Sequence, residues 1–489
     1  MPHDRSSMGR FTPGACRTRA SATRRLALLS LLVLTNSLAC GATAAPRTTA
    51  PAPASVYSIT DITVIDVERG VAVPRQTVVV EGDRITGIGA SARQAAPGRA
   101  RRIDGRGLFL MPGLVDAHVH YLDPPVFGRL MIANGVLLVR DMGMPNDYIL
   151  KMRDGLNRGE GLGPEMVATG TVLDGDPPLV PLISQGIKTP EEGRDAVRKQ
   201  AAAGVDMIKV YSRLDPDVFR AIVEEAQKHG LKAVGHVPET VDLEDAARAG
   251  LASSEHFFGF DRVIAGLLGA PVTRRYAGMG AGADYFQRLD EVDTAGLQQV
   301  YRRIRATGMA VCPTVVVFKS ATDMKAVQRD SFPRREYVSP AVFDIWKSQW
   351  SQQDDLSEFV WRNWARMVRG LSGAGVPLMV GTDLLFPGVF PGYAVHEEMA
   401  IWQDAGIAPT EILRSATLVP AKFMGLGARL GSVSEGMMAS MVLVRANPLE
   451  DVRNAGQIEG VFKRGQYFDR GDLDRLLEEA KALAGCSTP

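Results

Sequence analysis

Residues 111–120 read MPGLVDAHVH, and the pattern of the chain changes there. The apolar run from Leu114 to Ala117 predicts a buried strand, and His118 and His120 lie where that strand ends. Because side chains two residues apart in a strand share a face, both imidazoles point the same way. Two neighbouring imidazoles suit a divalent metal such as zinc. Ordinary packing or surface histidines have the same spacing, so a metal site needs further ligands.

Beyond this stretch, short apolar strands alternate with helical segments over about 300 residues, within the range of a single barrel domain. The clearest helix spans residues 215–229, with Asp215 as N-cap, Pro216 in the first turn and Gly230 after its end. The alternation predicts an α/β fold, a TIM-like (β/α)8 barrel; an open doubly wound sheet is the alternative, but no glycine-rich dinucleotide turn supports it. The predicted later strands are Val136–Val139, Met207–Val210, Ala233–Val237, Ala310–Val317 and Pro377–Val380.

Short β-branched runs flank the barrel on both sides, and Glu81-Gly82-Asp83 predicts a hairpin turn in the first group. We expect both groups to form one small β-sandwich domain from the two ends of the mature chain. Four tryptophans at helical spacing within the barrel predict a helical insertion, which packs as core or covers the site. The predicted parts are an export signal (1–44), a linker (45–55), the β domain (56–111 and 431–470), the barrel (112–430) with its insertion (about 257–365), and a C-terminal helix and tail (471–489).

Four further residues of metal-binding type follow or end predicted strands, the place where barrel enzymes gather their active groups. Lys209 stands in the apolar stretch Met207–Val210, where a charged ammonium is costly to bury. Any single one could be structural, since a histidine or an aspartate also caps helices. Metal-type residues at five strand ends are harder to explain by packing alone. The four residues are Lys209, His236, His256 and Asp383.

The composition is that of a folded globular protein. The 489 residues are 45% hydrophobic and 23% charged, and the formal net charge is +1. This balance provides no basic patch, so we expect no nucleic-acid partner. The chain has 4 cysteines, whose spacing fits neither a disulfide framework nor a zinc knuckle.

The first 44 residues predict an export signal. Arg24 and Arg25 precede an apolar run at residues 26–34, and Ala42-Thr43-Ala44 has the spacing that signal peptidase accepts. The run is shorter than the roughly 20 apolar residues that span a bilayer, so we expect no transmembrane span in the mature protein; a membrane anchor is the alternative. We therefore expect an exported protein, periplasmic or secreted. Lipid anchoring at Cys40 is a weaker alternative.

The motifs occur in a specific order along the chain. They are MPGLVDAHVH (111–120), Gly135-Val136 leading to Val139-Arg140-Asp141, GVDMIKV (204–210), Gly235-His236, Ser254-Glu255-His256, Gly381-Thr382-Asp383, and Ala416-Thr417 through Ala421. In this order they resemble the amidohydrolase superfamily over nearly the whole mature chain. The lysine in Ile208-Lys209-Val210 is similar to that of the binuclear branch with Xaa-Pro dipeptidases, which is related to imidazolonepropionase. Imidazolonepropionase itself uses one metal and lacks this lysine.

The resemblance implies two divalent metal ions, with zinc as the first choice. His118, His120 and Asp383 would hold the more buried ion, and His236 and His256 the more exposed one. Lys209, carboxylated by carbon dioxide to a carbamate, would bridge them; burial disfavours its ammonium form and so keeps the amine reactive. A hydroxide bridging the metals would be the nucleophile, and Asp383 would be the catalytic residue that accepts and returns its proton.

We therefore expect an exported metal-dependent amidohydrolase. It would cleave a C–N bond in a dipeptide, Xaa-Pro-like, or in an N-acyl amino acid. Lactams, lactones or phosphoesters are alternative substrates, and a noncatalytic metal- or ligand-binding protein is the alternative class. Tyr211 and His396 could contact a small-molecule substrate, although a packing tyrosine and a surface histidine explain them equally well. A homo-oligomer is left open.

Overall fold

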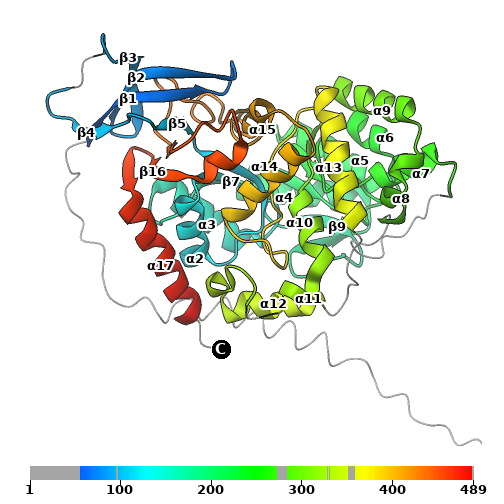
Figure 1. The fold of residues 1–489 in the computed structure, drawn as a ribbon. Coiled ribbons are helices and arrows are strands. Elements are labelled where there is room, and N and C mark those ends of the chain that lie inside the picture. The colour runs from blue at the N-terminus through cyan, green and yellow to red at the C-terminus, as the bar shows by residue number, and fades with distance from the viewer. Residues whose placement is uncertain are drawn as a thin grey trace, which may run out of the picture. The chain divides into compact units, whose positions relative to one another are not determined.

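The structure is a computed structural model (Figure 1), and it describes residues 55–94, 97–271, 283–327, 329, 331–350 and 358–486. The predicted export signal, with Cys40, and nearly all of the predicted linker lie outside these residues. Within the described part, no helix is long and apolar enough to cross a membrane.

Strands from both ends of the described chain pair in one eight-stranded sheet. Its order is β17-β16-β15-β5-β1-β2-β3, with β4 also paired to β1. Antiparallel pairing of β5 with β15 joins the two ends, and the predicted hairpin turn is present, since Glu81 pairs with Arg84. The sandwich of two sheets is not confirmed, because the pairing gives a single sheet. The strands are β1 (Val56–Asp66), β2 (Val71–Glu81), β3 (Arg84–Ala90), β4 (Arg101–Asp104), β5 (Phe109–Pro112), β15 (Met441–Val444), β16 (Ile458–Lys463) and β17 (Gln466–Asp469).

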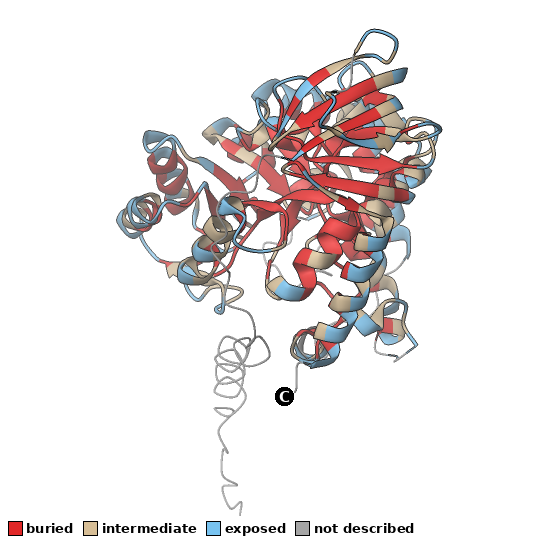
Figure 2. Ribbon diagram, turned by 90° about the vertical axis from the view of Figure 1, so that its left-hand side faces the viewer, coloured by how far each residue is buried: buried red, intermediate tan, exposed pale blue. Residues whose placement is uncertain are grey.

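Two parallel sheets make up the middle of the chain, which confirms the α/β class. One has the order β6-β7-β8 and the other β10-β9-β11-β12-β13-β14. Apart from β10, these strands are almost wholly buried, and Figure 2 shows buried strands inside the molecule, as expected for parallel strands covered by helices. The strands are β6 (Leu114–Val119), β7 (Val136–Asp141), β8 (Glu165–Ala168), β9 (Val172–Gly175), β10 (Ser184–Ile187), β11 (Met207–Val210), β12 (Lys232–Gly235), β13 (Leu251–Glu255) and β14 (Ala310–Cys312).

Two predicted strands differ from the structure. The predicted strand Ala310–Val317 ends at Cys312, and helix α10 begins at Val315, because the carboxylate of Glu398 binds the backbone N–H groups of residues 315 and 316. The predicted strand Pro377–Val380 makes only an isolated bridge at Leu378. Residues 377–384, which we call the closing segment, nevertheless bond to β14 on one side and to β6 on the other. These bonds run from Val311 N to Pro377 O, Met379 N to Val311 O, Ala117 N to Val380 O and His120 N to Leu384 O.

Helices cover the parallel strands, and α17 packs against α2 (Figure 1). The helix predicted at 215–229 is α5, which begins at Pro216. The predicted insertion at 257–365 is not wholly helical, because β14 lies inside it. The helices are α2 (Pro124–Ala133), α3 (Asn146–Arg158), α4 (Pro190–Ala203), α5 (Pro216–Lys228), α6 (Leu243–Ala249), α7 (Phe260–Leu267), α8 (Ala283–Gln287), α9 (Thr294–Thr307), α10 (Val315–Ser320), α11 (Met324–Val327), α12 (Pro340–Trp350), α13 (Glu358–Gly373), α14 (Tyr393–Asp404), α15 (Pro409–Ser415), α16 (Leu418–Phe423) and α17 (Arg470–Cys486).

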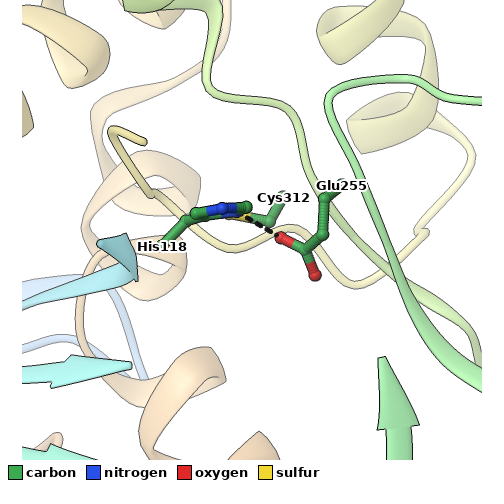
Figure 3. A group of neighbouring side chains, drawn as sticks. All are labelled: His118, Glu255 and Cys312. Atoms are coloured by element: carbon green, nitrogen blue, oxygen red, sulfur yellow. Dashed lines mark hydrogen bonds and ion pairs between the residues drawn. The ribbon is translucent and has the colours of Figure 1, made fainter. Parts of the chain in front are cut away.

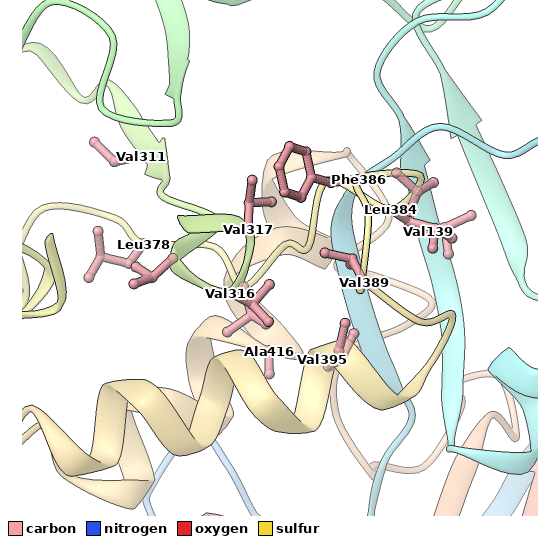
Figure 4. Close-up of a cluster of buried hydrophobic side chains, with 14 of the residues drawn as sticks. Val139, Val311, Val316, Val317, Leu378, Leu384, Phe386, Val389, Val395 and Ala416 are labelled. Carbon is pink, nitrogen blue, oxygen red and sulfur yellow. The ribbon is translucent and has the colours of Figure 1, made fainter. Parts of the chain in front are cut away.

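The apolar core reaches the closing segment. Figure 4 shows Val316 and Val317 of α10 beside Leu378 and Val389, with Val395 of α14 in the same cluster. All five side chains are buried. Burying an aliphatic side chain contributes roughly 1.5–3 kcal/mol, so this cluster holds α10, α14 and the chain around residue 383 in fixed positions.

Gly235, at the end of β12, should tolerate no side chain. Its φ is +132°, and an added Cβ would press on the carbonyl oxygen of Val210 and lie 2.9 Å from Cδ of Lys209. Gly204 is a matched control, because its φ is +84° and no atom lies within 4 Å of an added Cβ. We expect Gly204→Ala to lower the free energy of unfolding by about 1–2 kcal/mol through backbone strain alone. Gly235→Ala should lower it by about 1–3 kcal/mol more through overpacking.

Urea unfolding of both variants measures the difference. If both variants lose the same free energy of unfolding, the packing of β12 against Lys209 is not tight.

Candidate metal centre

The carboxyl ends of the parallel strands bring the six predicted ligands to one place. Parallel strands begin and end at common edges, so residues distant in sequence meet there. The closing segment runs beside β6 and brings its acid to the two histidines of that strand. The ligands and their positions are His118 in β6, His120 just after it, Lys209 in β11, His236 after β12, His256 after β13, and Asp383 in the closing segment.

Imidazoles surround the carboxylate of Asp383. Its Oδ1 lies 3.3 Å from Nε2 of His118 and 3.3 Å from Nε2 of His120, and its Oδ2 lies 4.0 Å from Nε2 of His256. The ring of His236 stands 5.1 Å from that of His256. One nitrogen of each of His118 and His120 and one oxygen of Asp383 thus lie within 4.8 Å of one another, a spacing that allows a shared metal ion. The four imidazoles and Asp383 form one compact set of donors.

The outer nitrogen of every imidazole in the set has a hydrogen-bond partner. If each Nδ1 carries the proton and donates it, each Nε2 presents a lone pair to the interior, as a metal requires. The buried Nε2 atoms of His118 and His236 have no hydrogen-bond partner among the described residues, which fits a position reserved for a cation. The Nδ1 contacts are His118 to Glu255 (3.0 Å), His120 to the carbonyl oxygen of Gly143 (2.9 Å), His236 to Ser212 (2.9 Å) and His256 to Thr314 (2.6 Å).

Lys209 is buried at the centre of this set, with an exposure of 1%. Burial lowers the pKa of its ammonium group to about 8. Burial first, and the Lys209 charge second, lower the pKa values of His118 and His236 well below that of free imidazole. Both imidazoles are therefore neutral near pH 7 and able to act as ligands.

Asp383 is ionised despite its burial. Burial alone would raise its pKa, but the imidazoles of His256, His118 and His120 lower it well below the usual value. A carboxylate among imidazoles completes a donor set of nitrogen and oxygen atoms that suits zinc and similar divalent metals.

Left-handed backbone occurs repeatedly at this site. His256, Phe257, Thr314, Asp383 and Leu385 all have positive φ, between 48° and 102°. Such conformations cost about 1–3 kcal/mol each in non-glycine residues and gather at functional sites. At His256 the turn of the backbone ends β13, so that Glu255 and His256 both face inward although they are adjacent. The strained backbone thus lets the side chains of Glu255 and His256 reach the same site.

Tyr211 stacks on a ligand. The ring of His236 has Tyr211 at 4.0 Å and Phe258 at 3.8 Å, with interplanar angles of 24° and 14°. The predicted contact between Tyr211 and substrate stays a prediction. His396 is not brought into the cluster, because its Nε2 binds the carbonyl oxygen of Asn134, just after α2. The structure therefore gives the predicted substrate contact of His396 no support.

A second layer of buried polar residues was missed by the sequence reasoning. Asp116 accepts hydrogen bonds from the backbone N–H and hydroxyl of Thr382 and from the N–H of His118. Arg140, on β7, pairs with Glu255. The sequence contained a sign of these contacts, because each is a charged residue inside a buried strand and must have a partner there.

The α/β fold and this donor set define the class, metal-dependent hydrolases with their site at the ends of parallel strands. The chain belongs to the amidohydrolase family, whose profile matches residues 109–467. It is accordingly a hydrolase that acts on carbon–nitrogen bonds, and the predicted superfamily is confirmed.

Several characterised proteins are similar to this chain. Ochratoxinase from Aspergillus niger is 22% identical, in an alignment covering 76% of this chain and 78% of the ochratoxinase. The structure of a bottromycin amidohydrolase has a TM-score of 0.70 and 24% identity, covering 89% of this chain and 91% of the other. A Xaa-Pro dipeptidase with methionine bound in its active site has a TM-score of 0.61 and 19% identity, covering 85% and 100%. The two structures show the shared fold.

Thr314 should stabilise the metal-free protein through its contact with His256. Thr314→Val keeps the shape but leaves the buried Nδ1–H of His256 without an acceptor, which costs about 1–3 kcal/mol. Thr314→Ser keeps the hydroxyl and should lose far less. Urea unfolding after chelation of metal measures both variants. Equal stability of the valine and serine variants would contradict the assignment of the bond.

Proposed function

We propose that this protein is a binuclear metallohydrolase that cleaves the amide bond of a dipeptide, Xaa-Pro-like, or of an N-acyl amino acid. The observation that carries the proposal is the convergence of three imidazoles on the carboxylate of Asp383, with His236 next to His256 and with Lys209 buried in the same strand region. The family match and the similarity to a Xaa-Pro dipeptidase and to ochratoxinase support an amide substrate.

The donor set divides into two groups in this proposal. His118, His120 and Asp383 would hold one divalent ion, and His236 and His256 would hold the other. Lys209 would supply a further anionic ligand as a carbamate, formed when its free amine adds to carbon dioxide and releases a proton. When bound, two zinc ions would lower the pKa of a water molecule and polarise the scissile carbonyl.

The protein's own residues then accept and donate the proton. Asp383 is ionised and its side chain is 19% exposed, so it can accept the proton of the attacking water and deliver it to the leaving nitrogen. Its position is fixed by the closing segment, whose N–H at Asp383 donates to the carbonyl oxygen of His118 at 2.8 Å. The four Nδ1 contacts hold the imidazoles in fixed orientations.

We further propose that the closing segment completes a closed eight-stranded barrel. Its hydrogen bonds to β14 and to β6 support this closure. The barrel domain would span residues 112–430, with the β domain formed by 56–111 and 431–470. Export remains a proposal that rests on the first 44 residues alone.

A substrate screen tests the peptidase assignment. Zinc-loaded protein should release free amino acid from at least one member of a library of dipeptides and N-acyl amino acids. Asp383→Asn should lower kcat/KM by about 10²–10⁴-fold, because it removes the proton acceptor, while keeping most of the metal. His396→Gln is the matched control and should leave the kinetics unchanged, since His396 lies outside the cluster.

Two outcomes would contradict the proposal. Failure of the zinc-loaded protein to release amino acid from any compound would exclude a peptidase. Absence of hydrolysis, together with metal or ligand binding that Asp383→Asn leaves unchanged, would favour the noncatalytic binding protein.

Metal uptake should depend on carbon dioxide. Apoprotein reconstituted with zinc in bicarbonate should take up more zinc than apoprotein reconstituted in carbon dioxide-free buffer, because only the carbamate form of Lys209 offers an anionic ligand. Lys209→Met should bind less zinc and show no bicarbonate effect. The measurement is elemental analysis after gel filtration, and equal zinc contents of the wild-type protein in both buffers would rule out the carbamate.

A further inference from the structure

We propose that Glu255 is a positioning residue that makes His118 the strongest imidazole ligand of the metal centre. The inference rests on the proposed function only in assuming that the site binds metal. It concerns a residue of the Ser254-Glu255-His256 motif for which the proposed mechanism has no use.

The carboxylate of Glu255 is held on every side. Its Oε2 lies 3.0 Å from Nδ1 of His118, which Figure 3 shows as a dashed line. Ser253 donates to Oε1 at 2.6 Å, and Arg140 donates to Oε1 at 2.9 Å and to Oε2 at 3.0 Å. His118, Arg140, Ser253 and Glu255 are all 0% exposed. A carboxylate with three partners in a dry interior has one available orientation.

Charge distinguishes this contact from those of the other ligands. The Nδ1 atoms of His120, His236 and His256 meet a carbonyl or a hydroxyl group, which are neutral. Among the four Nδ1 atoms, only that of His118 meets a carboxylate. An anionic acceptor fixes the tautomer and raises the basicity of the imidazole at its other nitrogen, Nε2. That Nε2 is buried without a hydrogen-bond partner in the described structure and faces Asp383.

The neighbouring thiol does not make this group a second metal site. The donor atoms of His118, Glu255 and Cys312 lie within 4.8 Å of one another (Figure 3). The guanidinium group of Arg140, however, already contacts both oxygens of Glu255, and it would repel a further cation in this low-dielectric interior. Glu255 therefore acts on a metal only through His118.

A structural explanation competes with the proposal. Glu255 could serve only to neutralise Arg140, because removing one partner of a buried ion pair leaves an uncompensated charge. This explanation predicts that the metal affinity depends on the pair and not on the carboxylate. The two roles separate when both members of the pair are replaced together.

The experiment measures zinc affinity of the full-length apoprotein by competition with a chromophoric chelator, together with urea unfolding. Glu255→Gln should weaken zinc binding by about 10–100-fold, the usual effect of losing such a partner, and should also lower stability. In Glu255→Gln with Arg140→Met, no unpaired charge is buried. Stability should recover, but zinc binding should stay about 10–100-fold weak.

Ser253→Ala provides a milder second variant if the others fold poorly. It removes one bond to Glu255 and one from Arg140 but none to His118, and it should weaken zinc binding by a smaller factor. Wild-type zinc affinity in the double variant, or in a folded Glu255→Gln, would overturn the proposal. So would an unchanged affinity in Ser253→Ala, if that variant alone were folded.

These experiments distinguish a failure of the role of Glu255 from a failure of the proposed function. A wild-type protein that binds zinc but hydrolyses no amide defeats the proposed function and leaves the role of Glu255 standing. A wild-type protein that binds no zinc defeats both. Equal affinities in wild-type and variant proteins defeat only the role of Glu255.

Discussion

The hydrogen bonds between β6 and the closing segment are the constraint on which the site depends. Asp116 accepts from the N–H of Thr382 at 3.0 Å and from its hydroxyl at 2.6 Å, and the N–H of Asp383 donates to His118 at 2.8 Å. These bonds set an acid from late in the chain beside two histidines from its early part. The same segment bonds to β14, so the contact that joins the sheets also assembles the donor set.

Each donor is oriented by a group behind it, and these groups belong to different elements. Thr314 precedes α10, whose first N–H groups bind the buried carboxylate of Glu398 on α14. The orientation of His256 therefore depends on a helix far from it in sequence. Left-handed backbone at His256 and Thr314 is the cost of this arrangement, and the surrounding packing offsets it.

The local sequence pattern predicted several of the strands and the candidate ligands. The predicted bounds of Met207–Val210 match β11, because an apolar run between turns needs no distant information. The six candidate ligands could be proposed because each follows or lies in a predicted strand and because the order of the motifs resembles the amidohydrolase superfamily. The start of α10 could not be predicted, since apolar β-branched residues favour a strand and only the distant Glu398 selects a helix. The partners of the imidazoles were missed for the same reason, because those contacts join different strands.

Within the proposed function, the charge of Lys209 would link metal binding to carbon dioxide. As an ammonium group it lowers the pKa values of the nearby imidazoles and repels any cation that enters. As a carbamate it carries the opposite charge, so the net charge of the set falls by two units at a point where the low dielectric strengthens every interaction. Binding linkage is reciprocal, so a carbamate that raises metal affinity by some factor must itself be stabilised by metal by that factor. Within the proposed function, the carbamate of Lys209 needs the cations to stabilise its negative charge, and the cations need the carbamate as an anionic ligand.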